Sequence, residues 1–121
     1  AQLDCVATAP ANRETATAET VFRALYTANP DIKAVFCCND AMALGVIGVL
    51  KDSGKKPGEL KIAGFDNDAV MTPLLKEGWL TATADAYAQQ MAVEGIKHAL
   101  RLLEAGESHC GDKATSYSLI C

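Results

Sequence analysis

The amino-acid sequence predicts an α/β fold, in which an open, mainly parallel sheet is flanked by helices. Three observations support this class. Short apolar runs alternate with longer segments whose apolar residues recur at helical spacing. The connections are short, which favours parallel strands joined by helices. A length of 121 residues suffices for one compact domain and not for two.

The first strand and helix are predicted near the start of the chain. Residues 3–9 (LDCVATA) read as a strand, and residues 14–28 follow as a helix. The Asn29–Pro30 pair ends that helix, because proline disfavours a helical conformation in the residue before it. One helical face carries Ala18, Val21, Phe22 and Leu25.

The middle of the chain repeats the pattern. Residues 32–38 (IKAVFCC) are short and nearly all apolar, as expected of a strand covered on both faces. Asp40 is placed to cap a helix over residues 41–52, which is apolar almost all round and so should be buried. After a turn, residues 60–65 (LKIAGF) form the next predicted strand.

A third and a fourth helix complete the pattern. A short helix is expected from about Thr72 to Glu77, followed by a strand over residues 80–84. The longest helix is predicted over residues 87–105, and residues 117–121 are a candidate last strand. The long helix has one apolar stripe, made of Ala88, Met91, Ala92, Gly95, Ile96, Ala99, Leu100 and Leu103.

Composition and chain ends exclude several classes of protein. The net charge of -4 argues against a nucleic-acid surface, which needs a basic stripe. No apolar run reaches the roughly 20 residues of a membrane span. The opening AQLDCVATAP has neither an initiating Met nor the features of a signal peptide, so we expect the chain to be a fragment of a secreted protein.

Polar side chains follow each predicted strand. In an open parallel sheet, ligands bind beyond the carboxyl ends of the strands, where helix N-termini gather. Neither a Gly-rich phosphate loop nor a zinc-type Cys/His spacing is present, and no cofactor or metal is expected. The amide, carboxylate and guanidinium groups suit a sugar or polyol. The side chains after the strands include Arg13, Asn39, Asp66, Asp85 and Tyr87.

Three stretches carry a family resemblance: NPDIKAVFCCNDAMALGVIGVLKDSG, LKIAGFDN and LLKEGWLTATA. They resemble the ribose-type periplasmic solute-binding proteins, which share a fold with the lactose-repressor family. The resemblance implies that Asn39 and Asp66 bind sugar hydroxyls, with Asp40 in a structural role. An ungapped count places Arg13 where the family often has a stacking aromatic residue, whereas a two-residue shift would make Arg13 a helix-start residue. Ala86 replaces a Gln, so Asp85 or Tyr87 is expected to substitute.

The resemblance also implies how the chain is organised. Residues 1–107 correspond to the C-terminal ligand-binding lobe, without its first strand–helix unit, and residues 108–121 to a polar linker with a possible final strand. The missing strand would lie between the strands at residues 3–9 and 32–38. The opposite lobe is expected as a partner, together with a membrane permease.

The implied function is solute binding for an ABC transporter, in a periplasmic or extracellular location and without catalysis. A monosaccharide or small polyol would bind in the cleft between two lobes that close by hinge motion. The alternative is the effector-binding lobe of a lactose-repressor-type regulator. A phosphoacceptor domain is disfavoured, because an acidic pair after an early strand and a Lys after a late strand are missing.

Overall fold

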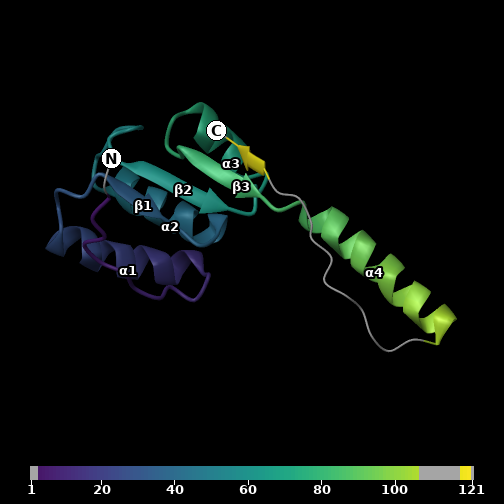
Figure 1. The fold of residues 1–121 in the computed structure, drawn as a ribbon. Coiled ribbons are helices and arrows are strands. Elements are labelled where there is room, and N and C mark those ends of the chain that lie inside the picture. Colours follow the sequence, from purple (N-terminus) through teal and green to yellow (C-terminus); the bar gives the residue numbers. More distant parts are fainter. Residues whose placement is uncertain (1–2, 107–117, 121) are drawn as a thin grey trace.

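The structure is a computed structural model that describes residues 3–106 and 118–120 (Figure 1). Helices and strands alternate along these residues, as the sequence predicts. The helices are α1 (Thr15–Ala28), α2 (Asp40–Asp52), α3 (Met71–Lys76) and α4 (Ala88–Ala105). The strands are β1 (Ala34–Phe36), β2 (Lys61–Phe65), β3 (Ala82–Asp85) and β4 (Ser118–Ile120).

The four strands form one sheet in the order β1-β2-β3-β4. β1, β2 and β3 are mutually parallel, whereas β4 runs antiparallel to β3. The expectation of an open, mainly parallel sheet is confirmed. Because these three strands are parallel, their carboxyl ends lie at one edge of the sheet. Asn39 and Asp66 follow β1 and β2 there, and Asp85 is the last residue of β3.

The core lies on one face of this sheet. Ile62 of β2 and Ile47 of α2 are buried in it, together with Met71 and Leu74 of α3. α1 packs closely on α2: a Cβ added to Gly45 would collide with the backbone carbonyl of Thr15. Glycine at this position therefore allows the two helix backbones to approach each other.

The predicted strand over residues 3–9 is wrong. These residues form neither helix nor strand, and Leu3 and Val6 are 91 % and 63 % exposed. A strand is stable only when its backbone groups pair with a neighbour. The strand expected beside this one is not among the described residues, so the segment has no ladder to join. The predicted strand over residues 32–38 is real but shorter, because it forms only at Ala34–Phe36.

α4 forms where its apolar period predicts, but it leaves the body of the domain. In Figure 1 it points away from the sheet, and none of its residues is buried. Among the described residues, no helix combines the length and apolarity needed to cross a bilayer. The linker predicted over residues 108–121 lies outside the described residues, apart from β4.

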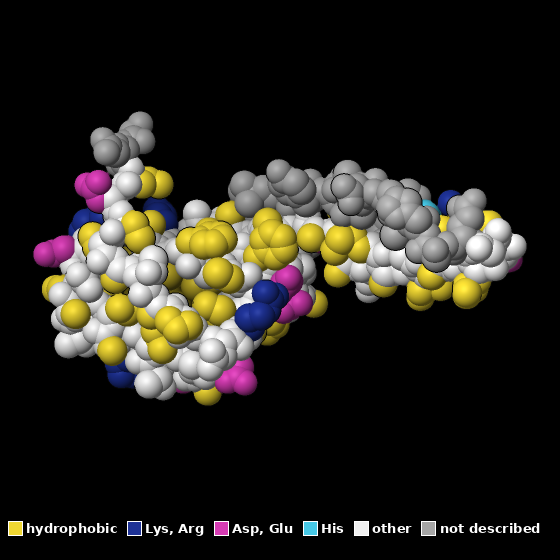
Figure 2. Space-filling model, turned by 60° about the horizontal axis from the view of Figure 1, so that its bottom comes forward, with side chains coloured by type: hydrophobic (Ala, Val, Ile, Leu, Met, Phe, Trp, Pro, Cys, Tyr) yellow, Lys and Arg dark blue, Asp and Glu magenta, His cyan; other side chains and the backbone are white. Residues whose placement is uncertain are grey.

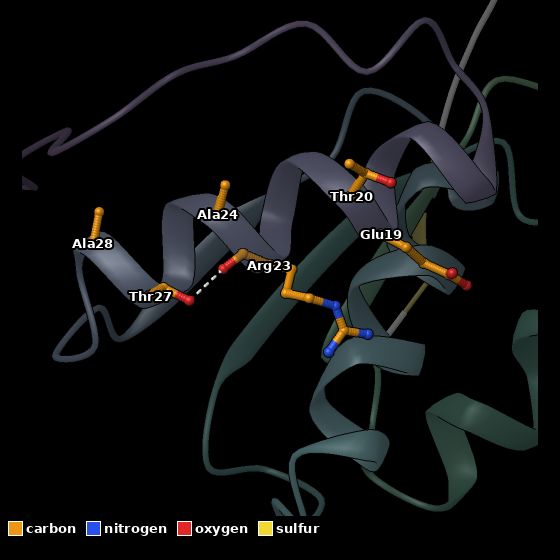
Figure 3. A pocket seen from close by; sticks show the side chains of 6 residues that line it. All are labelled: Glu19, Thr20, Arg23, Ala24, Thr27 and Ala28. Atoms are coloured by element: carbon orange, nitrogen blue, oxygen red, sulfur yellow. Dashed lines mark hydrogen bonds between the residues drawn. The ribbon is translucent and has the colours of Figure 1, made fainter.

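A hollow of about 560 Å³ lies along α1 (Figure 3). One of its lining residues is Arg23, whose guanidinium lies 3.2 Å from the Asp52 carboxylate. All six lining residues come from this one helix, so polar groups do not converge on it from several elements as in a small-molecule site. The lining residues are Glu19, Thr20, Arg23, Ala24, Thr27 and Ala28.

Candidate functional site

The candidate site is the edge where the parallel strands end, which we call the rim. It consists of the loop before α1, the start of α2, and the segments that follow β2 and β3. Hydrogen bonds and an ion pair connect these segments to one another. All five residues expected to bind a ligand lie in them: Arg13, Asn39, Asp66, Asp85 and Tyr87.

Asn39 holds two parts of the rim together. Its side-chain oxygen accepts the Met42 N–H at 3.0 Å, and its amide nitrogen donates to the Arg13 carbonyl at 3.2 Å. Asn39 is therefore the N-cap of α2, and the expectation that Asp40 caps this helix is wrong. With 6 % of its surface exposed, Asn39 retains one amide hydrogen and one oxygen lone pair for a ligand.

Arg13 and Asp66 face each other across the rim. The Arg13 Nη2 lies 4.0 Å from the Asp66 Oδ2, and the side chains are 68 % and 38 % exposed. Partial burial raises the pKa of the Asp66 carboxyl above its ordinary value. The neighbouring Asp68 and Asp40 act in the same direction, and Arg13 opposes them. Asp66 is thus an accessible hydrogen-bond acceptor beside an accessible cation, Arg13.

Asp40 supports the rim from beneath. Its carboxylate is fully buried and accepts the Asp68 N–H and the Thr83 hydroxyl, both at 2.8 Å. A Cβ at position 64 would overlap this carboxylate, so only glycine fits there. The GFD sequence thus combines a glycine that admits Asp40 with an Asp66 directed to the rim. These contacts give Asp40 the structural role that the sequence predicts.

A second network fixes the segment after β3. The Asn67 side chain donates to Asp85 Oδ2 at 3.0 Å, and its backbone N–H donates to the buried Thr83 hydroxyl at 3.3 Å. Asp85 Oδ1 accepts the Tyr87 N–H at 2.7 Å. Both Asp85 oxygens therefore accept hydrogen bonds within the protein, and Tyr87 beside it is 39 % exposed.

Backbone strain marks the same edge. Among the described residues, every non-glycine residue with positive φ lies in the rim. Such conformations disfavour most side chains and tend to cluster at functional sites. Asn67 is one residue that the analysis of the sequence missed. Its type, an asparagine directly after GFD, was the available signal, because asparagine tolerates positive φ. The residues are Asn12, Arg13, Asp66, Asn67 and Tyr87.

The side chains of the rim are suited to hydrogen bonding. Nowhere within residues 3–106 and 118–120 do three or more His, Cys, Asp or Glu side chains gather to hold a metal ion. Cys37 precedes the rim, but burial and the neighbouring Cys38 and Asp40 raise its pKa to about 12. The thiol thus stays protonated at neutral pH and is a poor nucleophile. The rim presents carboxylate, amide and guanidinium groups, which pair with hydroxyls.

Several relatives of the chain are named for the sugars that they bind. It is 42% identical over 88 residues to the D-ribose/D-allose-binding protein of Pseudomonas aeruginosa, covering 73% of this chain and 27% of that protein. An ABC transporter periplasmic solute-binding protein from Actinobacillus succinogenes, solved with bound D-allose, superposes with a TM-score of 0.84 at 27% identity. That match covers 95% of this chain and 40% of the other.

A regulator matches over a shorter stretch. An HTH-type transcriptional repressor of Histophilus somni is 51% identical over 35 residues, which is 28% of this chain and 10% of the repressor. The chain spans about a quarter to two fifths of the length of the sugar-binding relatives. The model of the periplasmic binding protein domain matches residues 2–108. Together with the parallel sheet and its polar rim, this match shows that the chain belongs to the periplasmic binding protein family.

Proposed function

We propose that this chain is the C-terminal ligand-binding lobe of an ABC transporter's solute-binding component. It binds a monosaccharide or small polyol without transforming it. The observation that carries the proposal is the convergence of Asn39 and Asp66 at one edge of the sheet, joined through Arg13. The relatives named for ribose and allose support the ligand class.

The roles differ among the rim residues. Asp66 accepts ligand hydroxyls, because its carboxylate is an accessible acceptor of the rim that lies beside a cation, Arg13. Arg13 donates to ring or hydroxyl oxygens where relatives of the family stack an aromatic ring. Tyr87 supplies an apolar edge, and Asp85 orients it through the Tyr87 N–H. Asn39 contributes its remaining amide hydrogen.

The rest of the binding site belongs to a second lobe, and the permease is a further partner. Half of the contacts of a ligand in a two-lobe cleft come from the opposite side, so this chain alone should bind weakly. A periplasmic or extracellular location follows from the transport role. The short repressor match keeps one alternative, the effector-binding lobe of a transcription regulator. A helix-turn-helix encoded upstream would decide for the regulator, and a signal peptide for transport.

Weak binding is best followed residue by residue. We expect D-allose, D-ribose and myo-inositol at millimolar concentrations to shift the amide NMR signals of Arg13, Asp66 and Tyr87. Asp66→Asn should remove most of the response, since it replaces the accessible carboxylate. The matched control is Asp52→Asn, which changes an exposed aspartate of α2 that pairs with Arg23.

The outcome is decided by where the signals move. Shifts confined to the rim, lost in Asp66→Asn and kept in Asp52→Asn, support the proposal. Shifts located elsewhere, or unchanged in Asp66→Asn, contradict the site. In the intact two-lobe protein, a thermal-shift screen against monosaccharides and polyols identifies the ligand, because binding to the native state raises the melting temperature.

A further inference from the structure

The segment that carries Asp66 has an unusual backbone conformation. Asp66 has φ 113° and Asn67 has φ 57°. Positive φ disfavours most side chains, and a residue keeps it only where neighbouring contacts stabilise it. Asp66 is also one of the exposed charges of the rim, and Figure 2 shows basic and acidic atoms together at the end of the body that carries the α4 arm. The direction of the Asp66 carboxylate therefore depends on the contacts that fix this segment.

Three consecutive backbone N–H groups attach the segment to the body of the domain. The N–H groups of Asp66 and Asn67 donate to groups of β3 at 2.9 Å and 3.3 Å. The Asp68 N–H donates to the buried Asp40 carboxylate at 2.8 Å. Every residue except proline has such an N–H group. These bonds therefore do not explain why an asparagine follows Asp66.

Asn67 adds a side-chain contact to these backbone bonds. Its Nδ2 donates to the Asp85 Oδ2 at 3.0 Å, in a partly buried position. The other oxygen of Asp85 accepts the Tyr87 N–H at 2.7 Å. Both oxygens of Asp85 thus face protein donors, and the carboxylate anchors the Asn67 amide. Asparagine suits position 67 for two reasons, because it tolerates positive φ and supplies the amide that reaches Asp85.

We propose that Asn67 is a positioning residue: by binding Asp85, it holds Asp66 in the orientation from which the Asp66 carboxylate meets a ligand hydroxyl. The Asn67 amide ties the residue after Asp66 to the end of β3, and this tie opposes relaxation of the turn toward negative φ. Asp85 then acts through Asn67, in place of the direct ligand contact that the sequence predicts for it. This inference rests on the proposed function, because it concerns the same binding site.

Exchange of the two side chains tests the role of Asn67. The response is the initial slope of the Asp66 amide NMR shift against D-allose concentration at pH 7. Asn67→Asp places one carboxylate against another and should lower this response roughly fivefold or more. Combining Asn67→Asp with Asp85→Asn restores the bond in reverse, because the amide at position 85 donates to position 67 and its oxygen accepts the Tyr87 N–H. The response of the double variant should return to within about twofold of that of the unmodified chain.

Two further variants separate the amide contact from the backbone conformation and from a direct role of Asp85. Asn67→Gly permits positive φ but lacks the amide, so its response should also fall. Asp85→Asn alone should lower the response less than Asn67→Asp does, since the Asn67 amide can turn over and accept a hydrogen bond from position 85.

The matched control makes the same chemical change away from the rim. Asn29→Asp removes an amide that donates to the Leu25 carbonyl at the far end of α1, and it should leave the response at Asp66 intact. Circular dichroism of every variant verifies that the chain is folded. If Asn67→Asp does not fold, Asn67→Gly carries the comparison with the unmodified chain.

The outcomes distinguish this inference from the proposed function. A response that falls in the Asn67 variants and returns in the double variant supports the inference. A full response in Asn67→Gly would overturn it, because the amide would then be dispensable. A loss in Asp85→Asn that the double variant does not restore would also overturn it, and would indicate that Asp85 binds the ligand directly. If the unmodified chain itself gives no response at the rim, the proposed function fails and the inference fails with it.

Discussion

α2 and α4 show how differently two apolar helices of one chain can be used. α2 is apolar almost all round and contributes Val46, Ile47 and Leu50 to the core. α4 has the more regular apolar stripe, but none of its residues is buried. The difference lies in the neighbours rather than in the helices, since α1 and the sheet enclose α2. Periodicity therefore predicts a helix and its apolar side, but not the surface that will cover that side.

The largest expected effect comes from truncating matched isoleucines in the two helices. Ile47→Ala should lower the free energy of unfolding by about 2–5 kcal/mol, because it leaves a cavity in the core. Ile96→Ala should change that free energy by less than about 0.5 kcal/mol in the monomer, as expected for an exposed residue. Urea unfolding is followed at a dilution where sedimentation shows a monomer. A cost above about 1 kcal/mol for Ile96→Ala would mean that α4 packs on its own sheet.

An intermediate effect distinguishes the two ends of α2. Asp40→Ala should cost about 1–3 kcal/mol or more, because the Asp68 N–H and the Thr83 hydroxyl lose a buried acceptor. Asp52→Ala removes only an exposed ion pair with Arg23 and should cost about 0–1 kcal/mol. Chemical denaturation of both variants measures the difference. Equal costs would show that the buried carboxylate does not organise the rim.

The smallest expected effect is that of Asp66→Asn on the free energy of unfolding. This substitution should stabilise the fold, whereas the others destabilise it. The pKa of Asp66 is raised in the folded state, so the stability linked to its proton is present at low pH and lost as pH rises through the raised pKa. Asp66→Asn removes the charge and should stabilise the fold at pH 7, by less than about 1 kcal/mol because the side chain is partly exposed.

Melting temperatures at pH 7 and pH 4 check this sign. The advantage of Asp66→Asn over the unmodified chain should shrink as the pH falls, since both side chains become neutral. Asp52→Asn, which removes an exposed carboxylate beside Arg23 on α2, is the matched control. A variant that is less stable at pH 7 would show that the ionised Asp66 strengthens the fold.

The sequence predicted the parallel sheet and α1, α2 and α3 well, because their apolar periods and turn residues agree with the contacts they make. It failed where a partner decides the outcome. Residues 3–9 have strand composition but lack a neighbouring strand in the described chain. Asn39 and Asp40 are adjacent and both able to cap, and only the space beside Gly64 determines that Asp40 turns inward. The left-handed conformations of the rim are likewise invisible in a pattern of apolar residues.

The contact between Gly64 and Asp40 belongs to the scaffold of the lobe and not to its proposed ligand-binding surface. A carboxylate occupies the volume of a missing methyl group, so neither residue can change without the other. Arg13 and Tyr87 lie at the outer side of the rim instead, where the Arg13 side chain is 68 % exposed and Tyr87 is 39 % exposed. Libraries that vary these outward positions while retaining Gly64 and Asp40 should therefore yield lobes that keep their architecture and differ in the solute they accept.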